Sequence, residues 1–172
     1  MKLQVEIANR QRKIKVSLKR LSKIVRKIIL ILKETGQLKK CNIENFDVLT
    51  ISVVLIGSKK MKETNYKYRG KKSTTDVLSF PYLETDNNLK EIYLGEILID
   101  PLQAKIQAKH YRVSLWQELT RLLIHGILHL MGYDHEVTAY EAKKMHRMEE
   151  KILNLLKNLI LQVFQFFLKF QP

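Results

Sequence analysis

The chain has 172 residues, of which 45% are hydrophobic, and its formal net charge is +14. Such a chain can bury one compact core, and no shift in composition marks a second domain. The single cysteine, Cys41, cannot form an internal disulfide or hold a metal with partner thiolates, so we expect a cytoplasmic protein. No run of about 18 to 20 apolar residues is present, so we expect no membrane span, and we expect no export signal.

The spacing of apolar residues predicts strands and helices in mixed order. Alternation over residues 2–10 indicates a strand, and helical spacing over 18–36 indicates a helix that ends at a glycine. Further strands are expected at 50–56, 76–82 and 93–100, and further helices at 58–68, from 101, at 115–131 and from about 138 to the C-terminus. This order predicts a single α+β domain with a mixed four-stranded sheet packed against helices.

The positive charge is concentrated in two segments. Residues 1–40 hold 13 Lys and Arg against 2 acidic residues, and residues 59–72 hold 7 against 1. These segments contribute +11 and +6, while the remaining residues sum to about −3. Charge gathered in this way indicates a polyanionic partner, such as a nucleic acid or a membrane surface. A solvated face that only keeps the protein soluble is the alternative.

Three of the five histidines lie within residues 124–135, IHGILHLMGYDH. His125 and His129 are four residues apart, so on a helix they project from one face about one turn apart. In a continuing helix, His135 would lie roughly 9 Å beyond His129, too far to join the pair. Gly132 can adopt the left-handed conformation that ends a helix, which would let His135 fold back toward the other two.

The pattern HxxxHxxxxxH therefore predicts a metal centre. Three neutral imidazoles leave one tetrahedral position open for water, as in catalytic zinc sites. A lone histidine at such a position would more often belong to the core, but three at this spacing favour a ligand set. The metzincin signature HExxHxxGxxH has the same spacing, and its glutamate is the general base of a protease. Gly126 stands at that position here, so this route to peptide hydrolysis lacks its base.

The segment HGILHLMGYDH resembles the HGxLHLxGYDH signature of the YbeY family, metal-dependent endoribonucleases of bacterial rRNA maturation and ribosome quality control. Residues 65–81, NYKYRGKKSTTDVLSFP, are similar to a second block of that family, and YLGEILI resembles its LGDI strand. The resemblance implies that His125, His129 and His135 hold one metal ion per chain, usually zinc, and that Arg69 is the functional arginine beside it. It also implies that the substrate is the 3′ end of 16S rRNA.

The residue types around this arginine suit RNA. The Arg69 guanidinium can hold two phosphate oxygens and offset charge that develops on phosphorus. Its basic and aromatic neighbours can contact phosphates and stack on unpaired bases; they are Lys67, Tyr68, Lys71 and Lys72. Asp134, beside the third histidine, either orients a histidine or caps the turn. The chain departs from the family pattern at three positions, where an acid, a proline and an aspartate are usual: Lys72, Thr74 and Glu96.

The resemblance extends to about residue 156, so we expect residues 1–158 to form the family domain and residues 159–172 an apolar C-terminal extension that packs against the domain or a partner. The family further implies four partners: single-stranded rRNA, the small ribosomal subunit, one of its proteins near the rRNA 3′ end, and a ribosome-associated GTPase. Two rival functions stay open: an rRNA-binding ribosome-assembly factor in which the metal is structural, and a zinc peptidase, which Gly126 and the basic charge disfavour.

Overall fold

The computed structural model describes the backbone of residues 1–86, 90–135 and 138–169, and the side chains of these residues except 83–86 and 159–169. The apolar packing expected for residues 159–172 therefore falls outside the described side chains. Among the described residues, no helix is long and apolar enough to cross a membrane.

Four strands form one mixed sheet: β1 (Lys2–Asn9), β2 (Val48–Leu55), β3 (Val77–Asp86) and β4 (Glu91–Ile99). The strand order is β1-β2-β4-β3, in which β1, β2 and β4 run parallel and β3 runs antiparallel to β4. The mixed four-stranded sheet expected from the sequence is thus confirmed. β3 lies at the edge, where Pro81 lacks the N–H that a central strand would need.

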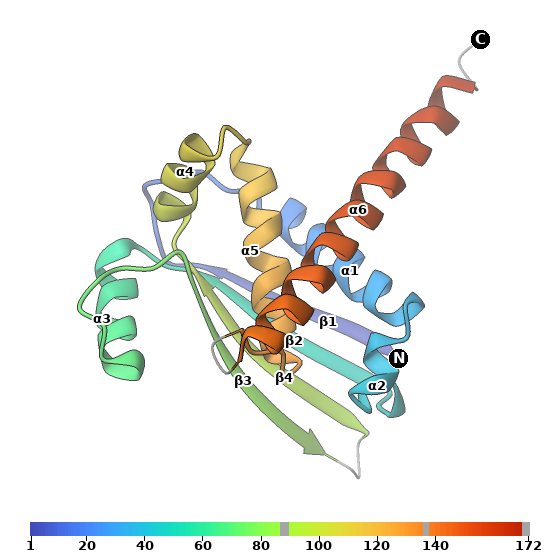
Figure 1. Cartoon of the computed structure of the whole chain (residues 1–172), viewed down its shortest axis with the longest axis horizontal. Coiled ribbons are helices and arrows are strands. Elements are labelled where there is room, and N and C mark those ends of the chain that lie inside the picture. Colours follow the sequence, from blue (N-terminus) through green and yellow to red (C-terminus); the bar gives the residue numbers. More distant parts are fainter. Residues whose placement is uncertain (87–89, 136–137, 170–172) are drawn as a thin grey trace.

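Six α-helices and one 3-10 helix accompany the sheet in the described residues: α1 (Leu18–Glu34), α2 (Gln37–Lys40), η1 (Ile43–Asn45), α3 (Ser58–Arg69), α4 (Pro101–His110), α5 (Leu115–Leu130) and α6 (Ala139–Lys169). α1 and α5 cover one face of the sheet, and α6 lies against both of them (Figure 1). The α+β prediction is confirmed. Only the short α2 and η1 were not expected, because three or four residues are too few to show a helical period.

Alternating side chains divide the core between the two faces of the sheet. Every second residue of β2 points toward α1 and α5 and is fully buried; these are Leu49, Ile51, Val53 and Leu55. On the opposite face, Val54 packs with Met61 of α3 in a smaller cluster. Burying one such side chain stabilises the fold by about 1.5–3 kcal/mol. α3 and α5 are therefore fixed independently, and the edge strand β3 lies where they approach each other.

Candidate metal centre

The helix α5 presents two of the three histidines. It begins with a capping box, in which the Gln117 N–H donates to the Ser114 hydroxyl at 3.2 Å and the Ser114 N–H donates to the Gln117 side chain at 2.8 Å. Its buried face contains Leu122 and Ile127, which pack into the main core. These anchors fix the rotation of the helix about its axis, so the histidine face points away from the core.

A Schellman motif ends this helix and redirects the chain. The N–H groups of Gly132 and Tyr133 donate to the carbonyls of His129 and Leu128, each at 3.0 Å. Gly132 has φ +85°, in the left-handed region that glycine adopts without a Cβ clash. The predicted break at Gly132 is confirmed, and it brings the His135 ring centroid within 5.1 Å of both helical histidine rings.

The three imidazoles form a group that can hold a metal ion. The Nε2 atoms of His125 and His129 are 3.2 Å apart, and one ligand nitrogen from each of the three histidines lies within 4.8 Å of the others. Metal–nitrogen bonds of about 2.0–2.1 Å in a tetrahedral site place two nitrogens about 3.3 Å apart. The donor set and the spacing of the helical pair therefore fit a zinc-type ion.

A carboxylate from α6 supports the first of these ligands. The Oε1 atom of Glu149 lies 2.7 Å from Nδ1 of His125, which leaves Nε2 of the same ring directed at His129. A metal-binding histidine commonly donates its other N–H in this way, which fixes the tautomer and the ring orientation. Burial raises the pKa of the Glu149 carboxyl, but the hydrogen bond with His125 and the positive charges of His125, Arg121 and His146 bring the net pKa below its ordinary value.

Glu149 was not among the site residues predicted from the sequence. It stands next to Glu150 on a helix rich in charged residues, and nothing in the local pattern separates the two. In the structure the Glu149 side chain is 16% exposed and faces His125, whereas the Glu150 side chain is 62% exposed. The difference follows from how α6 packs on α5, so a signal for it exists only in three dimensions.

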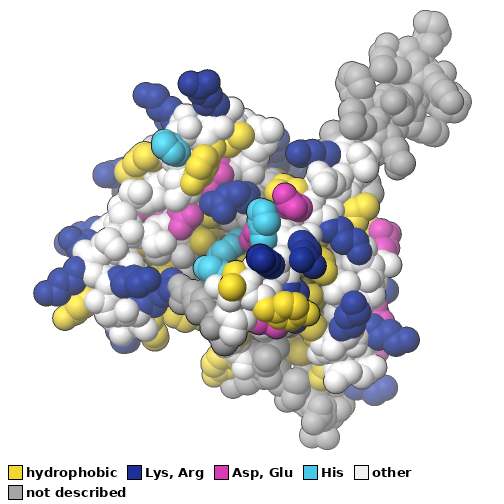
Figure 2. Space-filling view, in the orientation of Figure 1, with side chains coloured by type: hydrophobic (Ala, Val, Ile, Leu, Met, Phe, Trp, Pro, Cys, Tyr) yellow, Lys and Arg dark blue, Asp and Glu magenta, His cyan; other side chains and the backbone are white. Residues whose placement is uncertain are grey.

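The histidines open into a cleft of about 200 Å³. Arg69 from the end of α3 lines this cleft with the three histidines and Asp134, and the first residues of β3 complete the wall. Figure 2 shows histidine side chains in the middle of this face of the molecule, with Lys and Arg side chains around them. The predicted arginine and the predicted ligands, 56 or more positions apart in the chain, are thus brought to one place.

The loop after α3 is held close to that helix. The Gly70 N–H donates to the carbonyl of Tyr66 at 3.0 Å, and the buried Asn65 donates from Nδ2 to the carbonyl of Ser73 at 2.8 Å. These bonds fix both sides of Arg69, so its backbone position does not depend on a ligand.

The other four candidate RNA contacts do not line the cleft. The side chains of Lys67, Tyr68, Lys71 and Lys72 are exposed around the end of α3. The Tyr68 ring stacks edge to face with Phe80 at a centroid distance of 4.9 Å and is 60% exposed. These residues lie at the surface near Arg69, where their predicted contact with RNA stays a prediction.

Gly126 has a packing role that explains the missing glutamate. A Cβ at this position would lie 2.9 Å from Cγ2 of Ile97 and 3.1 Å from Oγ of Ser79. The helix therefore passes too close to β4 and β3 for any side chain, and the position faces the sheet. A general base in the metzincin manner has no room here, which counts further against the peptidase alternative.

Comparison with known proteins places the chain. The family model described as Endoribonuclease YbeY matches residues 6–157. An Endoribonuclease YbeY of Thermodesulfovibrio yellowstonii is 52% identical over 159 residues, covering 91% of this chain and 99% of the relative, and one of Petrotoga mobilis is 32% identical, covering 90% and 96%. The solution structure of TM1509 from Thermotoga maritima is similar with a TM-score of 0.50 and 27% identity, covering 87% of each chain. The chain therefore belongs to the YbeY endoribonuclease family.

Proposed function

We propose that this protein is a metal-dependent endoribonuclease that cleaves single-stranded RNA. The observation that carries the proposal is the cleft in which three histidines and Arg69 meet, because these residues lie in the two segments that resemble the family motifs. Relatives that match nearly the whole chain bear the name Endoribonuclease YbeY.

The residues of the cleft have distinct roles in this reaction. His125, His129 and His135 would hold a divalent ion, which would supply Lewis-acid chemistry for phosphodiester hydrolysis, and we propose zinc as that ion. Arg69 binds two oxygens of the scissile phosphate through its planar guanidinium and offsets the negative charge that grows in the transition state. Glu149 keeps the His125 ring in one tautomer and one orientation.

We further propose that the substrate is the 3′ end of 16S rRNA in the small ribosomal subunit, and that the protein works in the cytoplasm in rRNA maturation and ribosome quality control. A subunit protein near the rRNA 3′ end and a ribosome-associated GTPase are the proposed protein partners. The family resemblance and the net charge of +14 support this assignment. Co-sedimentation of the protein with purified small subunits, compared with large subunits, tests it.

The central experiment separates the role of Arg69 from metal binding. Arg69→Ala should lower the rate of cleavage of single-stranded rRNA by about 10²–10³-fold, the usual effect of removing one transition-state donor. Metal content by elemental analysis should stay at one ion per chain. Lys62→Ala, an exposed cation on the same helix, is the matched control and should keep full activity.

Each other outcome points elsewhere. Loss of metal in Arg69→Ala would mean that the arginine is structural. Wild-type protein that binds metal, is folded and engages rRNA but never cleaves it would favour the ribosome-assembly factor. Digestion of casein that a chelator abolishes would revive the peptidase.

A further inference from the structure

A second hollow lies between α1, α5 and α6, apart from the histidine cleft. It has a volume of about 640 Å³. Apolar side chains from α1 and α6 form part of its lining, among them Ile24 and Leu156. Exposed or half-exposed lysines from the same two helices line it as well: Lys23, Lys27 and Lys157. The groove therefore combines apolar surface with positive charge.

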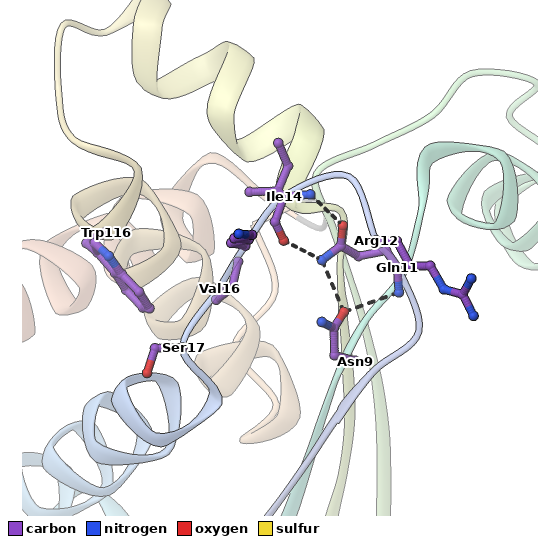
Figure 3. A pocket seen from close by; sticks show the side chains of 8 residues that line it. Asn9, Gln11, Arg12, Ile14, Val16, Ser17 and Trp116 are labelled. Carbon is purple, nitrogen blue, oxygen red and sulfur yellow. Dashed lines mark hydrogen bonds between the residues drawn. The ribbon is translucent and has the colours of Figure 1, made fainter.

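The single tryptophan of the chain, Trp116, stands in the wall of this groove and continues it into a neighbouring hollow of about 650 Å³. In that hollow the ring faces the loop between β1 and α1, with Arg12 on the far side (Figure 3). The Arg20 guanidinium lies 4.2 Å from the centroid of the ring. Trp116 therefore lines both hollows, and a cationic side chain stacks on its ring.

The loop that carries Arg12 is braced from inside. The side-chain amide of Gln11 donates to the carbonyl of Ile14 at 2.8 Å and accepts from the Ile14 N–H at 2.9 Å. It also donates to Asn9 Oδ1 at 3.1 Å, and the Gln11 side chain is buried (Figure 3). The backbone from which the cationic side chain of Arg12 projects is therefore held in one conformation.

The acidic side chain that lines the described part of the groove is neutralised. Glu118 is 2% exposed and accepts from Arg121 through two hydrogen bonds of 2.6 and 3.0 Å. Arg121 also lies 3.5 Å from Asp76, at the start of β3. Every exposed charge along this lining is therefore positive, which excludes a basic partner.

We propose that this groove binds the single-stranded RNA that flanks the cleaved bond, a proposal that rests on the nuclease function proposed above. Arg121 lines the groove, and His125 follows it one helical turn later, about 6 Å along α5, so the groove leads toward the candidate metal centre. Extended RNA suits such a surface because its phosphates meet the lysines while its bases pack on Trp116 and the apolar floor. An acidic peptide satisfies the charge, but only its aromatic residues can stack on the ring, whereas every nucleotide of RNA carries a planar base.

The fluorescence of Trp116 reports on the groove without interference, because the chain contains no other tryptophan. Full-length protein is titrated with single-stranded oligouridylate, which absorbs little where tryptophan is excited, and a gel verifies that the oligonucleotide stays intact. Saturable quenching is expected. The slope of log affinity against log salt should be negative, at about 0.7 per phosphate contacted.

A pair of variants matched in charge locates the binding. Lys23→Ala with Lys27→Ala removes two groove cations, and Lys39→Ala with Lys40→Ala removes two exposed cations from α2. At about 0.1 M salt each lost contact lowers affinity by about fivefold, so the groove pair should weaken binding by up to about 25-fold and the α2 pair by little. Circular dichroism establishes that both pairs are folded.

The outcomes separate this proposal from the nuclease function. Equal weakening by both pairs, or no quenching at saturating oligonucleotide, would overturn the groove proposal even if the protein cleaves RNA. Quenching by polyglutamate as strong as that by oligouridylate would also overturn it and indicate a peptide site. If the protein binds RNA through the groove but cleaves none, the groove proposal is supported and only the nuclease function is overturned.

Discussion

Replacing Glu149 with Gln tests whether the carboxylate from α6 supports the metal centre. The variant keeps the shape of the side chain but removes the charge that His125 Nδ1 meets at 2.7 Å. Loss of such an outer carboxylate usually lowers metal affinity by about 10–100-fold, which corresponds to about 1.4–2.7 kcal/mol. The side chain is only 16% exposed, so water replaces the lost interaction poorly and an effect within this range is expected.

Competition for zinc against a chromogenic chelator measures this affinity directly. Glu150→Gln is the control, because its carboxylate is 62% exposed and lies 3.5 Å from His146 but does not touch a candidate ligand. If both variants yield zinc to the chelator at the same concentration as the wild type, Glu149 does not support the site.

The same variant has a pH signature in stability. Because the pKa of Glu149 is lower in the folded chain than its ordinary value, its ionised form stabilises the fold at neutral pH. That contribution is fully present above the ordinary carboxyl range of about 4.3 and is lost as pH falls through the lowered value. The gap in unfolding free energy between wild type and Glu149→Gln, measured in urea, should therefore close on acidification, and a gap that widens there would contradict the assignment.

Other predictions address the packing around the site. In Gly126→Ala the new Cβ lies 2.9 Å from Ile97. The cost of overpacking, about 1–3 kcal/mol, should outweigh the gain in helix propensity of about 1 kcal/mol, so the urea midpoint of unfolding should fall. An unchanged midpoint would show that β4 moves to make room for the methyl group. Arg121→Met leaves the buried Glu118 carboxylate without its cation. The free energy of unfolding should fall by about 3 kcal/mol, which lowers the thermal denaturation midpoint by roughly 6–12 °C. A shift of less than a degree would mean that water replaces the arginine. Burial raises the pKa of the Cys41 thiol, although the charges of Lys144 and Lys40 act to lower it. Iodoacetamide at mildly alkaline pH should therefore label the native chain more slowly than the urea-unfolded chain. Equal labelling rates would contradict the raised pKa.

The histidine cluster could be predicted from the sequence because its three candidate ligands lie within 11 consecutive residues. A four-residue spacing and a glycine break fix their relative positions through local geometry alone. Glu149 acts on His125 from 24 residues away, and only the packing of α6 on α5 brings the two together. The groove around Trp116 was invisible for the same reason, since its walls come from three helices that the sequence pattern does not place against one another.

Hydrophobic alternation also misplaces the end of one strand, for a reason other than long-range packing. The strand expected at 76–82 continues to Asp86, because residues 84–86 of β3 pair with residues 91–93 of β4. The segment Leu83–Asp86 is partly acidic, so it looks like a loop when only hydrophobic alternation is considered. At a sheet edge, however, pairing needs only backbone N–H and carbonyl groups, and polar side chains are tolerated.

If His125, His129 and His135 hold a metal ion, the hydrogen bond between α5 and α6 links metal loading to the docking of the last described helix. If Glu149 raises metal affinity by about 10–100-fold, a saturating ion stabilises the docked helix by the same factor, about 1.4–2.7 kcal/mol. When the ion is scarce, α6 would then detach from α5 more often than the rest of the domain unfolds. The rate of amide hydrogen exchange along α6 would therefore depend on the supply of metal in the cell. A protease that removes α6 would weaken metal binding while leaving all three histidines in the chain.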